Sequence, residues 1–126
     1  MVVFITCLGM PELVFNLLDG FRVSIKEVVS KLMKIKADNV YVMAPSDLIA
    51  IYGQWLVVNV QVISMERPSE ELLEKLWGCV LGESVRFATA HLPHCQNILA
   101  SEVIWISTND VKLRFPQEVA TEDSDD

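Results

Sequence analysis

Metal or catalytic chemistry is suggested most directly by one short stretch, because His91, His94 and Cys95 fall within five residues. Imidazole nitrogens and a thiolate are ligands that zinc prefers. A structural zinc site normally adds a fourth ligand and a second spaced pair, and here Cys7 or Cys79 would have to be supplied by the fold. We therefore interpret the stretch as a polar loop after a strand, and we expect neither a metal nor a cofactor.

Other patterns of catalytic centres do not occur in the sequence. It has no Gly-x-Ser-x-Gly nucleophile, no glycine-rich phosphate loop and no His-Glu-x-x-His zinc motif. The acidic pair Glu70-Glu71 begins a predicted helix, where the helix dipole accounts for it without catalysis. These observations predict that the chain is not an enzyme.

The composition predicts a large core and additional apolar surface. The chain has 126 residues, of which 52% are hydrophobic, and its mean hydropathy is +0.35. No apolar run approaches the roughly 18 residues of a membrane span, and the N-terminus lacks the basic region of a signal peptide. Because the three cysteines are an odd number, we expect reduced thiols in a cytosolic or nuclear protein. We expect the surplus apolar surface to mediate self-association.

Charge is concentrated in two places. The net charge is −7, and residues 117–126 hold five acids and no base, which predicts a disordered acidic tail after a single domain over residues 1–116. Five of the ten basic residues fall between Arg22 and Lys36. We interpret them as a solvated helix face, with docking of an acidic partner, such as another copy's tail, as the alternative.

The nine residues from Trp55 to Ile63 predict a strand with an unusual outer face. One alternate set, Leu56, Val58, Val60 and Val62, is wholly apolar and suits a core. The other set combines three apolar residues with two neutral amides and carries no charge, which is unusual for a face exposed to solvent. We predict that this second face is a self-association surface, formed by Trp55, Val57, Asn59, Gln61 and Ile63.

The remaining elements predict an α+β fold. Strands are expected at residues 2–8, 39–43, 47–52, 84–91 and 101–107. A brief helix is expected over 11–19, with Gly20 after its end. Ser24 to Glu27 reads as a capping box that begins a longer helix, and Pro68-Ser69 begins another that ends at Gly82. No internal repeat is visible. The order predicts a ferredoxin-like, split β-α-β sheet, antiparallel or mixed, with two main helices on one side, forming a dimer.

A ferredoxin-like sheet also raises the possibility of RNA binding. That activity needs aromatic residues on central strands and a basic surround, whereas the first strand offers only Phe4 and the chain is acidic. We expect neither nucleic-acid nor membrane partners.

The spacing of these elements resembles the adenovirus protein of early region four, open reading frame three. The resemblance covers about residues 2–110 and rests on the short first strand, Asp38 to Met43 after a helix, the valine-rich strand and Leu72-Leu73-Glu74. It implies a non-enzymatic viral early protein of the host nucleus that self-assembles and sequesters host factors, among them promyelocytic leukaemia bodies, DNA-repair proteins and tripartite-motif proteins. It also implies partner binding at Ser101, Glu102 and Val103, while the family's assembly asparagine falls at Gly82, which leaves assembly beyond a dimer open.

A second hypothesis comes from a different class of protein. A ferredoxin-like regulatory module would bind a small molecule at a dimer interface, with His91 to Cys95 at its edge. A saturable rise in melting temperature in a screen with amino acids, nucleotides and zinc would favour this module over the scaffold.

Overall fold

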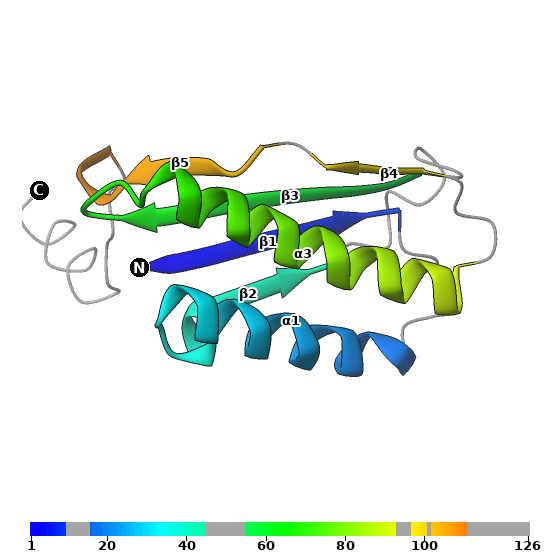
Figure 1. The fold of residues 1–126 in the computed structure, drawn as a ribbon. Helices are drawn as coiled ribbons and strands as arrows, with labels where there is room; N and C mark the ends of the chain where they lie inside the picture. The colour runs from blue at the N-terminus through cyan, green and yellow to red at the C-terminus, as the bar shows by residue number, and fades with distance from the viewer. Residues whose placement is uncertain (10–15, 45–54, 93–96, 101, 111–126) are drawn as a thin grey trace, which may run out of the picture.

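Two β-α-β units lie side by side in the computed structural model, which describes residues 1–9, 16–44, 55–92, 97–100 and 102–110 (Figure 1). The first unit consists of β1 (Val2–Leu8), α1 (Leu18–Met33) and β2 (Val40–Met43). The second consists of β3 (Trp55–Ser64), α3 (Glu70–His91), β4 (Asn97–Ala100) and β5 (Ile104–Ser107). Two short 3-10 turns, η2 (Ala37–Asn39) and η3 (Thr108–Asp110), complete the described elements.

The strands form one mixed sheet in the order β2-β1-β3-β4, with β5 also pairing with β3. β1 and β2 are parallel, and β4 and β5 are parallel to the first and second halves of β3. The two units meet where β1 and β3 pair antiparallel, with Ile5 opposite Val60. Because the strands of each unit pair directly, the predicted split β-α-β topology is wrong, whereas the α+β class with a mixed sheet is confirmed.

Both long helices cover the same face of the sheet and run antiparallel to each other (Figure 1). The core lies between these layers, and alternate strand residues point into it. On β3 the inward residues are those that the sequence predicted, Leu56, Val58, Val60 and Val62, each at most 2% exposed. Among the described residues, no second layer covers the opposite face of the sheet.

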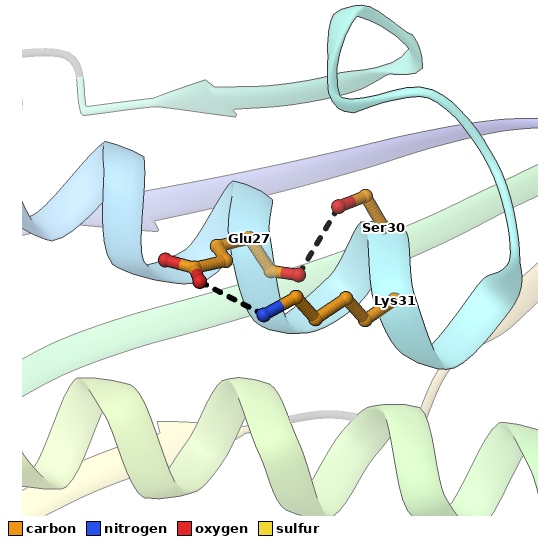
Figure 2. Close-up of polar contacts among 3 residues, drawn as sticks. All are labelled: Glu27, Ser30 and Lys31. Atoms are coloured by element: carbon orange, nitrogen blue, oxygen red, sulfur yellow. Dashed lines mark hydrogen bonds and ion pairs between the residues drawn. The ribbon is translucent and has the colours of Figure 1, made fainter.

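The capping box expected at Ser24 is not formed, because α1 begins six residues earlier at Leu18. Ser24 instead donates a hydrogen bond across to Glu83 on α3. Glu27 forms an ion pair with Lys31, and its carbonyl oxygen accepts from the Ser30 hydroxyl (Figure 2). An early start was missed because Gly20, which suggested a helix end, lies inside the helix.

The second helix is longer than expected, and residues 84–91 are helical rather than a strand. Ser69 caps its start by accepting from the Leu72 backbone N–H at 3.2 Å. Buried residues continue at helical spacing past Gly82, namely Leu73, Leu76, Val80, Ser84, Phe87 and Ala88. The buried Ser84 hydroxyl is satisfied by the Val80 carbonyl oxygen. Glycine therefore does not end this helix, because its inward face remains apolar on both sides of Gly82.

Several expectations cannot be compared with the structure. The strand over 47–52, most of the helix over 11–19 and the acidic tail 117–126 lie outside the described residues, as does the domain boundary at 116. The last expected strand is shorter, since β5 spans Ile104–Ser107. Trp77 on α3 is 37% exposed.

Candidate functional site

The open sheet face is the side of the sheet that the helices leave uncovered, and none of its described residues is charged. Register places these side chains together: Val2, Phe4, Thr6, Leu8, Tyr41, Met43, Val57, Asn59, Gln61, Ile63, Ile104 and Ile106. Phe4 stacks on Tyr41 with ring centroids 5.1 Å apart. A large apolar surface without charge is typical of an interface between subunits.

The predicted self-association residues lie on this face where the structure describes them. Val57, Asn59 and Ile63 are partly exposed and Gln61 is exposed. The side chain of Trp55 lies outside the described part of the chain. Sequence alternation was sufficient to group these residues, because side chains along a strand alternate between faces.

A second feature is a groove of about 420 Å³ between α1 and α3, which we call the interhelical groove. Its polar residues are Ser24, Glu83, Arg86 and His91, and its apolar residues include Phe21 and Phe87. The Glu83 side chain is only 11% exposed, and its carboxylate accepts from the Ser24 hydroxyl at 2.8 Å and faces Arg86 at 3.3 Å. Thus a carboxylate, a guanidinium and an imidazole line one surface groove.

A third feature, which we call the acidic groove, has a volume of about 570 Å³. It is lined by residues of α3, of the loop before it and of the segment before β5: Arg67, Glu70, Leu73, Glu74, Trp77, Gly78, Glu102 and Val103. Three carboxylates and one guanidinium make its rim acidic. Two of the expected partner-binding residues, Glu102 and Val103, line this groove, while Ser101 lies outside the described residues.

The expected loop of metal-ligating residues is not a loop at its start, because His91 is the last residue of α3. Its ring packs against Phe87 with centroids 5.0 Å apart. His94 and Cys95 lie outside the described residues, and among those described no three His, Cys, Asp or Glu residues are placed to hold a metal ion.

Two buried polar side chains in the core have structural explanations. Burial raises the pKa of the Cys7 thiol to about 12, which keeps it protonated and unreactive at neutral pH. The Ser64 hydroxyl accepts from the Trp105 indole N–H at 3.1 Å and donates to the Glu66 carbonyl oxygen at 2.6 Å. Neither side chain is poised as a nucleophile.

Sequence reasoning missed the link between Ser24 and Glu83. These residues are 59 positions apart. Ser24 was predicted to begin a helix, and Glu83 fell between a helix predicted to end at Gly82 and a strand predicted from residue 84. The helical spacing of Ile25, Val29 and Met33 on α1 and of Leu76 and Val80 on α3 gives the inward faces, from which the contact between the helices follows.

Comparison with known proteins gives no match to a family model and no match to a curated protein. Solved structures do match over nearly the whole chain. Malonate semialdehyde decarboxylase has 16% identity and a TM-score of 0.56, covering 98% of this chain and 98% of that one. 5-Carboxymethyl-2-hydroxymuconate delta-isomerase has 11% identity and a TM-score of 0.61, covering 96% and 93%. A fused 4-OT, solved as an asymmetric trimer, has 10% identity and a TM-score of 0.61, covering 93% and 98%.

The chain has a tautomerase-like fold. This finding overturns the resemblance to the adenovirus early protein. That resemblance rested on the spacing of helices and strands, and two β-α-β units with directly paired strands produce the same spacing. The viral, nuclear-body and host-sequestering expectations were implied by that resemblance alone and are wrong with it. The expectation that the chain is not an enzyme is also corrected, since matching structures are a decarboxylase and an isomerase.

Two further expectations concern the protein's location in the cell and its relation to membranes. A location in the host nucleus is untested, and it loses its basis with the viral resemblance. Within the part of the chain that the structure describes, no helix is long and apolar enough to cross a membrane.

Proposed function

We propose that this chain is the subunit of a homo-oligomeric enzyme that processes a small carboxylate bearing a carbonyl or enol group. The observation that carries the proposal is the fold, in which two β-α-β units each have directly paired strands. This fold matches that of a decarboxylase and an isomerase along almost the whole chain. Malonate semialdehyde and 5-carboxymethyl-2-hydroxymuconate, named with those proteins, share this substrate chemistry. Proton transfer at the carbon next to a carbonyl group is catalysed by a side chain that is positioned to act as a general acid or base.

The open sheet face supports the oligomer. Its lack of charge and its aromatic and aliphatic side chains favour burial against other copies. The fused 4-OT with the same fold was solved as a trimer, whereas we had predicted a dimer. Either assembly would use Val57, Asn59, Gln61 and Ile63, and the number of subunits is open to measurement.

The interhelical groove offers a candidate base and a candidate carboxylate-binding residue. In the interhelical groove, Glu83 could accept a proton while Arg86 pairs with a substrate carboxylate, which makes Glu83 the first residue to change.

The test is turnover of a panel of 2-oxo acids, 3-oxo acids and 2-hydroxydienoates, followed by absorbance of the enol and by proton exchange in deuterated water. Saturable turnover supports the proposal, and no turnover above the buffer rate for any member contradicts it. If turnover occurs, Glu83→Gln should lower kcat/KM at least about tenfold when Glu83 is the base. Glu71→Gln, on the same helix but outside both grooves, is the matched control.

A second candidate is a regulatory module that binds such a carboxylate without turnover. It is favoured by Arg86 in the interhelical groove, because a guanidinium can pair with a carboxylate whether or not a proton is then transferred. A saturable rise in melting temperature with the same compounds, without proton exchange, would support this function.

A further inference from the structure

The acidic groove differs from the other charged surfaces of the helices in how its carboxylates are paired. Elsewhere on the helices, carboxylates pair with a base one turn away, as Asp19 does with Arg22 and Glu71 with Lys75. Glu74 has Glu70 and Glu71 one turn before it and Trp77 and Gly78 one turn after it. Within the groove, Glu70 also pairs with Arg67. Neither Glu74 nor Glu102 makes an ion pair among the described residues, so these two carboxylates keep the rim negative.

Apolar surface lies between these carboxylates. Trp77 is 37% exposed, and the buried Leu73 and the partly buried Val103 line the same groove. An exposed indole face attracts ammonium and guanidinium groups, and the aliphatic part of a lysine or arginine packs on apolar surface. The combination therefore suits a long cationic side chain better than a metal ion.

Gly78 adds an observation that is independent of charge. A Cβ built at this position would meet nothing within 4 Å. Its φ is not positive, because Gly9 is the only glycine with positive φ among the described residues. Neither packing nor backbone conformation thus requires glycine within α3, although glycine weakens a helix relative to alanine. What glycine does provide is close access to the helix backbone from the groove.

We propose that the acidic groove is a docking site for an extended basic peptide segment of a partner protein. One arginine or lysine side chain lies over Trp77 between Glu74 and Glu102, and the peptide backbone passes over Gly78. Charge complementarity identifies this occupant, since an acidic segment, including residues 117–126 of this chain, would be repelled. The proposal does not depend on the enzymatic function, because neither Glu83 nor the open sheet face takes part.

The test is fluorescence anisotropy of a labelled nonapeptide that alternates arginine with leucine, titrated with the full-length protein. We expect saturable binding, weakened at least about tenfold in the double variant Glu74→Gln, Glu102→Gln. Gly78→Leu should weaken binding similarly by filling the groove. Gly82→Leu is the matched control, because Gly82 also has open space around it on α3 and lies outside the groove.

Three outcomes would overturn the proposal. The first is binding that these groove variants leave unchanged. The peptide would then be held by negative charge outside the groove, such as that of residues 117–126. The second is equal binding of a peptide with glutamate in place of arginine. The third is complete competition by free arginine at the peptide's own concentration, which would indicate a small-cation site. Circular dichroism of each variant verifies that the fold is retained.

Discussion

Along β3, residues that face the helices alternate with residues on the open sheet face, yet different requirements determine them. The inner residues Val58, Val60 and Val62 are buried by this chain's own helices, so the fold of one subunit accounts for them. The outer residues Val57 and Gln61 meet no second layer within the described part of the chain. Burial against other copies, as proposed above, would explain why they carry no charge. The contrast separates what folding needs from what assembly needs.

The largest expected effect is that of a new charge on the inner face. Val60→Asp buries a carboxylate at a position that is 2% exposed, and it should reduce the free energy of unfolding by more than about 4 kcal/mol. Gln61→Asp places the same side chain on the outer face one residue later, and it should leave the fold intact. Urea unfolding measures both. Equal destabilisation by the two variants would contradict the distinction between the faces.

A second test of the inner layer uses pH. Burial raises the pKa of Cys7 from 9.0 to about 12, so between these values the unfolded chain loses the thiol proton while the folded chain keeps it. Stability should therefore be unaffected by this group below about pH 9 and should fall above it, by up to about 1.4 kcal/mol per pH unit. Cys7→Val removes this contribution, so a variant with the same alkaline slope as the parent would refute the assignment.

The contact between the helices should have a moderate effect. Ser24→Ala removes the hydroxyl that donates to the nearly buried Glu83 carboxylate, and should cost about 1.5–3 kcal/mol. Ser30→Ala removes an exposed hydroxyl that donates to the Glu27 carbonyl oxygen, and should change stability by less than about 0.5 kcal/mol. Thermal and urea unfolding of the pair would show whether the interhelical bond matters. Indistinguishable variants would mean that it does not.

The smallest effect is expected on the outward side of α3. Gly82→Ala adds a methyl group where nothing lies within 4 Å, and it should stabilise the protein by about 0.5–1 kcal/mol through helix propensity. A loss of stability in urea would instead reveal that another subunit packs closely on this helix, so that the open sheet face is not the only assembly surface.

How far the sequence predicted the fold depended on the kind of signal. The alternation in Trp55–Ile63 gave β3 and both of its faces correctly, because period-two patterns are direct consequences of strand geometry. Glycine was misleading at Gly20 and Gly82, both of which lie within helices. The extension of α3 through Phe87 could have been found by following buried residues at helical spacing past Gly82.

Topology and the candidate site were harder to predict. The two β-α-β units share no visible sequence repeat, so the direct pairing of β1 with β2 could not be distinguished from a split arrangement. The interhelical groove depends on Ser24 meeting Glu83 across 59 residues, a contact that local patterns do not encode. The acidic groove depends on Glu102 lying beside α3, which likewise follows only from three-dimensional placement.

The most direct test of the central claim is the molar mass of the full-length protein and of Val57→Glu, measured by light scattering after size-exclusion chromatography at micromolar concentration. Assembly through the open sheet face predicts a parent mass that is a multiple of 14.2 kDa and a folded variant at the mass of one chain. A parent that elutes as a single chain, or a variant whose mass is unchanged, would contradict it.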